Sequence, residues 1–203
     1  MAGRRWSTIG AAAATVIALL AISIATLGSE VWHAFATSLS FTQSVVLEQG
    51  GTGWEKIQSA FAAARNWGAD VSTAYAIQMA LAIGLAATLA RLWHGTAPAE
   101  LKSAGLVVAS LLATPYVLDY DLVALAVALA FLVRHGLICG FRDYEISLLA
   151  AAWIVPLLSR SIAGATGIPL GLVVLLALYV SILRRAAIER NLATSLAMKI
   201  AQA

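Results

Sequence analysis

Between Arg5 and Glu30 the chain contains no ionisable side chain. A run of this length and apolarity suffices for a helix that crosses the hydrocarbon core of a bilayer, which takes about 20 residues. The whole chain follows the same pattern, because 61% of its residues are hydrophobic and only 11% are charged. In a soluble domain about a quarter of the residues are charged. The sequence therefore predicts an all-α, polytopic membrane protein built as a transmembrane helix bundle.

The start of the chain has one feature of a secretory signal peptide, because Arg4 and Arg5 precede the apolar run. The apolar core of a signal peptide has roughly 7–15 residues, and this run is longer. We therefore expect the segment to stay in the protein as its first membrane span.

Apolar segments recur along the chain and are separated by short polar stretches. We expect about six spans in a single membrane domain, 1–203, in which the third to fifth spans are shorter than ideal. The alternative is four spans, with the short segments re-entrant. The predicted spans cover residues 8–27, 71–90, 103–118, 122–138, 146–159 and 166–183, followed by a cytoplasmic tail over 184–203 that reads as an amphipathic helix.

Positive charge sets the predicted orientation. With a cytoplasmic N-terminus, ten of the 13 Lys and Arg residues fall on the cytoplasmic side, and Lys56, Arg65 and Arg160 fall outside. This is the positive-inside bias of membrane proteins. Both termini are then cytoplasmic, and Asp119 and Asp121 face the extracytoplasmic side. We expect the membrane to be the bacterial cytoplasmic (inner) membrane.

The longest connection, residues 28–70, is predicted to be a structured extracytoplasmic loop. Val31, Trp32, Phe35 and Leu39 recur at helical spacing. This pattern indicates an amphipathic helix that lies at the membrane surface. A loop of this length with structure of its own is usually functional.

The same loop contains signals for a second helix. Gly50 and Gly51 interrupt the chain, and the order Thr-Gly-Trp-Glu over 52–55 predicts a capping box at the start of a helix. We expect this helix to end at Asn66 and Gly68, and Asp70 to cap the span that follows. The residues expected on one face of the helix are Trp54, Ile57 and Phe61.

The junction after the third predicted span carries the strongest candidates for chemistry. Asp119 and Asp121 lie there with Tyr116 and Tyr120, and ionisable groups so close to a bilayer are functional candidates. The carboxylates could bind a sugar hydroxyl, share a divalent cation with a lipid phosphate or act as a general base, and the tyrosines could stack on a sugar. In the alternative, one aspartate caps the next span, the other is solvated, and the tyrosines belong to the interfacial belt.

Two further groups are candidates for substrate binding. Glu48 and Gln49 precede the glycine pair and Lys56 follows it, so that the backbone can approach a sugar or phosphate closely. Arg160, at the end of a span, could pair with the phosphate of a lipid. A solvated loop and a snorkelling side chain are the corresponding alternatives.

Several classes of function lack their sequence signature here. There is no Gly-rich nucleotide motif and no nucleophile elbow, and His33, His94 and His135 are far apart in the sequence. We therefore predict no protein-ligated metal centre, no certain cofactor and no nucleic-acid partner. The single cysteine, Cys139, is interpreted as a buried or lipid-facing thiol.

Several segments, taken in order, resemble glycosyltransferase family 87, whose members are polyprenyl-phosphate-mannose-dependent mannosyltransferase-like proteins of the C superfamily of membrane glycosyltransferases. The Ala-Thr-Pro-Tyr…Asp-Tyr-Asp-Leu stretch carries the clearest likeness. The segments concerned are residues 28–32, 45–59, 112–122, 140–142 and 153–160.

The resemblance implies transfer of a hexose, typically mannose, from a polyprenyl phosphate to a lipid or glycan acceptor outside the cytoplasm. Family members are about twice this length, and the likeness is to their C-terminal half. The catalytic carboxylate of the superfamily lies in an earlier loop that has no counterpart here, which leaves the base unassigned. The chain would then be the C-terminal part of such an enzyme. The alternatives are a non-catalytic subunit that binds a lipid-linked sugar, beside membrane lipids and a catalytic N-terminal half or partner, and a small transporter component.

Overall fold

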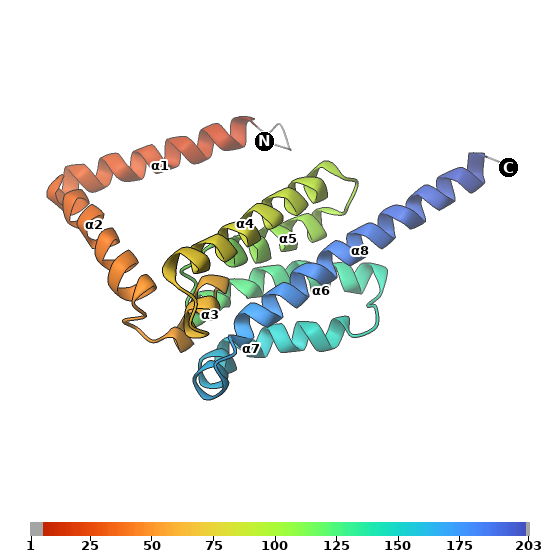
Figure 1. Ribbon diagram of the computed structural model, residues 1–203. Coiled ribbons are helices and arrows are strands. Elements are labelled where there is room, and N and C mark those ends of the chain that lie inside the picture. The colour runs from red at the N-terminus through yellow and green to blue at the C-terminus, as the bar shows by residue number, and fades with distance from the viewer. Residues whose placement is uncertain (1–5, 202–203) are drawn as a thin grey trace. The chain divides into compact units, whose positions relative to one another are not determined.

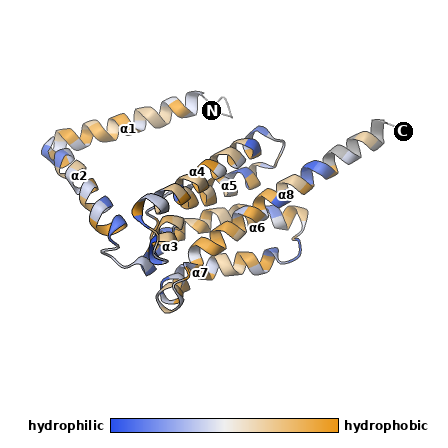
Figure 2. Ribbon diagram, in the orientation of Figure 1, coloured by the Kyte–Doolittle hydropathy of each residue, from blue (hydrophilic) through white to orange (hydrophobic). Residues whose placement is uncertain are grey.

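The computed structural model describes residues 6–201, which are almost entirely helical. The chain separates into two compact units, residues 1–51 and 52–203, and each is described by itself. Along the ribbon, apolar residues fill the middles of the long helices, and polar residues gather at helix ends and in connections (Figures 1 and 2). This distribution confirms the predicted all-α membrane protein. The expectation of a single domain over 1–203 stays a prediction.

The first unit is formed by helices whose apolar side chains are exposed. Helix α1 spans Trp6–Leu27, and none of its residues is buried. Helix α2 spans Glu30–Phe41 and confirms that residues 31–39 are helical. It continues into a π-helical turn, η1, over Thr42–Glu48. Gly50, at φ +69°, then ends the helix, as its sequence predicts.

The second unit packs the remaining helices around one apolar core. The element order is η2 (Trp54–Lys56), α3 (Ala60–Asn66), α4 (Val71–His94), α5 (Ala99–Ala113), η3 (Asp119–Ala124), α6 (Leu125–Cys139), α7 (Glu145–Thr166) and α8 (Leu170–Ala201). Helix α5 contacts α4, α6 and α8. Its fully buried Leu101, Ala104 and Val108 therefore lie at the centre of the unit.

Helix α5 ends because of Pro115. The residue before a proline is excluded from helical backbone angles, and Thr114 is accordingly extended at φ −83° and ψ 135°. The helix end leaves carbonyl groups without helical partners inside the bundle. Gln78 of α4 supplies the missing donor, because its Nε2 lies 2.9 Å from the Leu112 carbonyl oxygen and 3.0 Å from that of Ala113.

The capping box predicted over residues 52–55 is wrong. Gly53 precedes only one 3-10 turn, and the hydroxyl of Thr52 has no hydrogen-bond partner. Ile57 then pairs with Leu118 as an isolated antiparallel bridge. The helix starts instead at Ser59, whose hydroxyl accepts the Ala62 N–H at 3.1 Å. Tertiary pairing of the backbone thus overrides the helical pattern of Trp54, Ile57 and Phe61.

Five helical segments within residues 6–201 are long and apolar enough to cross a membrane. Helix α5 has 15 residues and is by itself too short to cross a membrane. It rises about 22 Å, and the extended residues 114–118 add about 16 Å. Together they exceed the hydrocarbon thickness of about 30 Å. The count of six spans stays a prediction, and this segment is the one on which it depends.

The last two spans differ from their predicted bounds. Helix α7 continues through Pro156 and Arg160 to Thr166, where Gly167, at φ +70°, ends it. The connection between the last two spans therefore lies at residues 167–169, not at the 160–165 that the predicted bounds leave between them. Helix α8 runs through the predicted tail to Ala201 in one piece, because no Gly or Pro interrupts it after Leu183.

Asp70 caps α4 as predicted. Its Oδ1 accepts the Thr73 N–H at 2.8 Å, and Ser72 donates its hydroxyl to Oδ2 at 3.1 Å. Hydrogen bonding by Thr73, and then by Ser72, holds the pKa of the Asp70 carboxyl below its ordinary value of 3.8. Folding lowers this pKa, so the contribution of the cap is present above the unfolded pKa and is lost as the pH falls through the folded pKa.

We predict that Gln78→Leu destabilises the protein by about 1–3 kcal/mol. The substitution removes the donor to the end of α5 and also the acceptor of the buried Phe61 N–H, which lies 3.1 Å from Gln78 Oε1. Thermal unfolding in detergent measures the effect. Met79→Leu, at a neighbouring exposed position, is the control and should leave the melting temperature nearly unchanged. Equal melting temperatures for the two variants would contradict this role of Gln78.

Candidate functional site

One end of the second unit is built around the extended segment 114–118. Its backbone is held by Gln58, whose N–H donates to the Val117 carbonyl oxygen at 2.8 Å. The Gln58 side chain reaches further, because Nε2 donates to the Glu55 carbonyl oxygen at 2.8 Å and Oε1 accepts the Gly171 N–H at 3.0 Å. One buried residue, Gln58, therefore joins η2, the extended segment and the start of α8 through its backbone N–H and its side-chain amide. We call this region the η3 end.

Asp119 and Asp121 have different surroundings within the η3 end. Asp121 Oδ2 accepts the Leu118 N–H at 2.9 Å and so fixes the turn by which the chain enters η3. Asp119 Oδ1 accepts the N–H of the neighbouring Tyr120 at 3.0 Å. Both carboxylates are half-buried. The capping alternative therefore describes Asp121, whereas Asp119 binds only the N–H of its immediate neighbour.

The two tyrosines flank this turn. Tyr116 is half-buried, and its N–H donates weakly to the Thr114 hydroxyl at 3.4 Å. Tyr120 is 67% exposed. A flat ring in this exposed position can stack on a sugar or stand in the lipid headgroup layer.

Lys56 and Arg160 also belong to the η3 end. Lys56 closes η2, directly before the bridge between Ile57 and Leu118. Arg160 lies in α7 one turn before Gly164, whose Cα faces the Glu55 side chain. Neither cation makes an ion pair within residues 6–201. Two positive charges therefore share this end with the two carboxylates.

The last two predicted site residues lie in the first unit. Glu48 ends η1, and its Oε1 accepts the Gln43 side-chain amide at 3.1 Å. Gln49 is exposed. Glu48 and Gln49 therefore belong to residues 1–51, whereas Lys56, Tyr116, Tyr120, Arg160 and the two aspartates belong to residues 52–203.

The sequence interpretation missed a charged cluster at the opposite end of the same unit. Arg185 of α8, of whose side chain only 7% is exposed, pairs with Glu145 of α7. Its Nε donates to Glu189 Oε1 at 2.9 Å, and its Nη2 donates to the Gly140 carbonyl oxygen at 2.8 Å. His135 Nε2 lies 2.8 Å from the same Glu189 oxygen. The cluster ties α6, α7 and α8 together where the chain turns.

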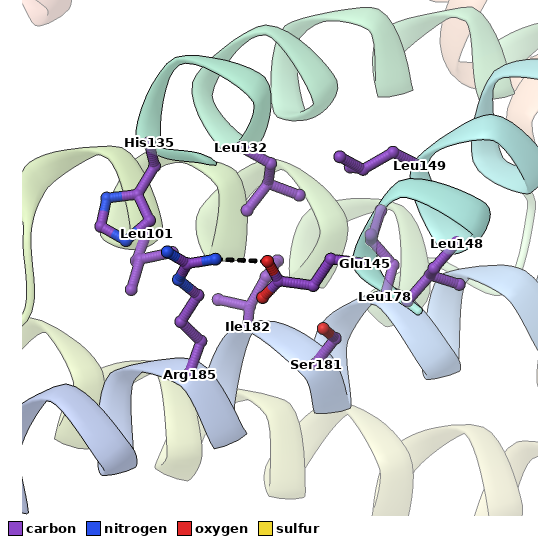
Figure 3. Close-up of a pocket in the computed structure, with 10 residues that line it drawn as sticks. All are labelled: Leu101, Leu132, His135, Glu145, Leu148, Leu149, Leu178, Ser181, Ile182 and Arg185. Atoms are coloured by element: carbon purple, nitrogen blue, oxygen red, sulfur yellow. Dashed lines mark hydrogen bonds and ion pairs between the residues drawn. The ribbon is translucent and has the colours of Figure 1, made fainter. Parts of the chain in front are cut away.

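Figure 3 shows Arg185, Glu145 and His135 of this cluster at the wall of a pocket that five leucines also line, with the Arg185 guanidinium and the Glu145 carboxylate joined. His135, for which the sequence indicates no partner, is 3% exposed. A usable signal was present, because Glu145 and Glu189 are acidic residues on the side that the charge pattern makes basic. Such residues next to apolar spans need cationic partners.

Within residues 6–201, no group of three or more His, Cys, Asp or Glu side chains is arranged to hold a metal ion. A divalent cation at Asp119 would therefore have to take its other ligands from water or substrate oxygens, as magnesium commonly does. Cys139 is exposed on α6 and forms no disulfide.

The second unit thus has the character of a membrane-embedded helix bundle with charged residues at both ends. Residues 1–115 match the sequence model of Glycosyltransferase family 87. That range covers more than half of the 203 residues, and the chain belongs to this family. Membership makes it an integral membrane protein of a glycosyltransferase family and implies a lipid-linked sugar as donor. No curated protein and no solved structure matches the chain.

The matched range includes the segments at 28–32 and 45–59 and stops within the one at 112–122. The resemblance noted at 140–142 and 153–160 lies beyond it. Lys56 therefore falls inside the matched range, whereas Asp119, Asp121 and Arg160 follow it.

We predict that Arg185→Gln destabilises the protein by about 3–5 kcal/mol, because Glu145 is left buried without its counter-charge. Thermal unfolding in detergent again gives the measurement. Arg184→Gln changes the same residue type at the adjacent, exposed position, and it should have little effect. A loss of stability no larger than that of Arg184→Gln would show that the cluster does not hold the helices together.

Proposed function

We propose that the protein acts in the transfer of a hexose from a polyprenyl-phosphate donor to a lipid or glycan acceptor at the extracytoplasmic face of a bacterial cytoplasmic membrane.

 The hexose in this proposal is mannose, the sugar that the family resemblance implies. The observation that carries the proposal is membership of family 87, together with a carboxylate, Asp119, that lies at the η3 end with one oxygen uncommitted. The chain would act as the C-terminal part of such an enzyme.

The cations of the η3 end suit the donor. A polyprenyl phosphate carries negative charge beside an apolar chain. At the end of an apolar bundle, Lys56 offers an ammonium donor and Arg160 a guanidinium donor. Since neither cation is paired within residues 6–201, phosphate binding would not require an existing ion pair to break. Glu48 and Gln49 of the first unit are proposed to bind hydroxyl groups of the sugar or the acceptor.

The carboxylates suit the sugar and the acceptor. In the transfer step, the acceptor hydroxyl oxygen attacks the anomeric carbon, the bond from that carbon to the phosphate oxygen breaks, and the hydroxyl proton passes to a carboxylate. We assign Asp119 to contact with the reacting hydroxyl groups. Asp121 is a positioning residue, because it holds the Leu118 N–H and with it the turn that carries Asp119. Tyr116 and Tyr120 supply surfaces on which the sugar stacks.

We predict that Asp119→Asn lowers sugar transfer by about 100-fold or more, the usual scale for loss of a general base. Asp121→Asn should lower it less, because the asparagine oxygen can still accept the Leu118 N–H. The assay uses membranes that contain the protein and a radiolabelled polyprenyl-phosphate mannose, and it counts label in the acceptor fraction.

Asp70→Asn is the matched control. It makes the same chemical change at an exposed aspartate, and asparagine caps a helix as well as aspartate does. Transfer at the wild-type rate by Asp119→Asn would refute the assignment of Asp119. Absence of transfer by the wild-type protein, with retained binding of the lipid-linked sugar, would favour the non-catalytic subunit instead.

A further inference from the structure

A second surface of the molecule, distant in sequence from the η3 end, has the features of a lipid site. It is a groove between the α6–α7 connection, the first turns of α7 and the middle of α8, and it holds about 1310 Å³ of space counted out to its open mouth. None of the residues assigned to sugar transfer lines it. We call it the α7–α8 groove.

The floor of the groove is apolar. Leu148 of α7 and Ala177, Val180 and Ile188 of α8 line it. Ala177 and Val180, which precede Arg184 on α8, are exposed, Val180 to 50%. On a helix that spans a membrane, such exposed aliphatic side chains face the hydrocarbon of the bilayer. An acyl chain therefore fits this floor.

The mouth of the groove is basic. Arg142 and Arg184 line it, both are exposed, and neither makes an ion pair within residues 6–201. Arg185 and Glu145 also line it, but they neutralise one another. Asp143 is the other acidic residue in the lining, and it makes no ion pair within residues 6–201. The excess of positive charge favours an anionic ligand at the mouth.

Position along α8 sets the level of the mouth. Arg184 directly follows the apolar run of α8 that ends at Leu183, so that it stands where a span leaves the hydrocarbon. Tyr144, beside Arg142, is 86% exposed and has a left-handed backbone at φ +65°. A non-glycine residue in that conformation is strained, and such strain gathers at binding sites. Because Arg184 lies at the end of the apolar run, the mouth of the groove lies at the depth of the lipid headgroups.

We propose that the α7–α8 groove binds an anionic phospholipid of the surrounding bilayer, with its phosphate at Arg142 and Arg184 and an acyl chain along Val180 and Ala177. The groove combines an apolar floor open to the hydrocarbon with unpaired guanidinium groups at headgroup depth. The lipid is a structural ligand, distinct from the lipid-linked sugar of the transfer reaction, and the proposal does not depend on that reaction.

The test titrates short-chain phosphatidylglycerol and phosphatidylcholine into the purified full chain in non-ionic detergent and counts bound lipid by native mass spectrometry. The wild-type protein should prefer phosphatidylglycerol. The double variant Arg142→Gln with Arg184→Gln should lower its affinity for phosphatidylglycerol by about ten- to thirty-fold, on the usual scale for two arginines near a membrane surface. Arg142 keeps its backbone N–H bond to Glu145 in this variant, at 2.9 Å.

Two further variants make the test specific. Arg91→Gln with Arg134→Gln removes the same charge from exposed positions outside the groove, and it should leave the affinity unchanged. Ala177→Phe fills the floor without a change of charge and should weaken binding of both lipids. It also keeps the proposal testable should the arginine variant fail to fold.

Four outcomes would overturn the proposal. The first is an unchanged affinity for phosphatidylglycerol in the groove variants, and the second is an equal loss of affinity in the control variant, which would indicate surface charge alone. The third is displacement of phosphatidylglycerol by millimolar inorganic phosphate, which would indicate a site for soluble phosphate. The fourth is tighter binding of farnesyl phosphate than of phosphatidylglycerol, which would indicate a site for the polyprenyl carrier.

Discussion

Two buried glutamines hold the part of the second unit on which the candidate site depends. Where Pro115 ends α5, the chain runs extended inside an apolar bundle, and each unpaired backbone group there would be costly. Gln78 binds the last carbonyl oxygens of α5, and Gln58 binds both the extended segment and the start of α8. The turn that carries Asp119 and Asp121 follows directly from this arrangement.

The second unit is consequently polar at two ends for different reasons. At the η3 end, Lys56, Arg160 and Asp119 keep their charges available, which suits binding and chemistry. At the opposite end, Arg185, Glu145, Glu189 and His135 satisfy one another and hold three helices, which suits stability. Function is therefore proposed where charge is uncommitted, and the buried cluster is assigned to the fold.

Much of the fold could be predicted, because long apolar runs and caps are local signals. The helical membrane bundle, the helix over 31–39 and the Asp70 cap all follow from such patterns. The predicted capping box failed because pairing between Ile57 and Leu118, far apart in sequence, overrode a local motif. The Arg185 cluster and the roles of Gln58 and Gln78 were missed for the same reason: their partners come from other helices. For the candidate site, the capping role of Asp121 was foreseen as one alternative.

The central claim is that α5 and the extended segment together carry the chain across the membrane, which would put the η3 end on the extracytoplasmic side and the α6–α7 connection on the cytoplasmic side. Single cysteines at two exposed positions, Tyr120→Cys and Tyr144→Cys, each in a Cys139→Ala background, test it most directly with a membrane-impermeant maleimide. We predict labelling of Tyr120→Cys in intact cells and of Tyr144→Cys only after permeabilisation. Labelling of Tyr144→Cys in intact cells, with Tyr120→Cys labelled only after permeabilisation, would contradict the account, because α5 would then not cross the membrane.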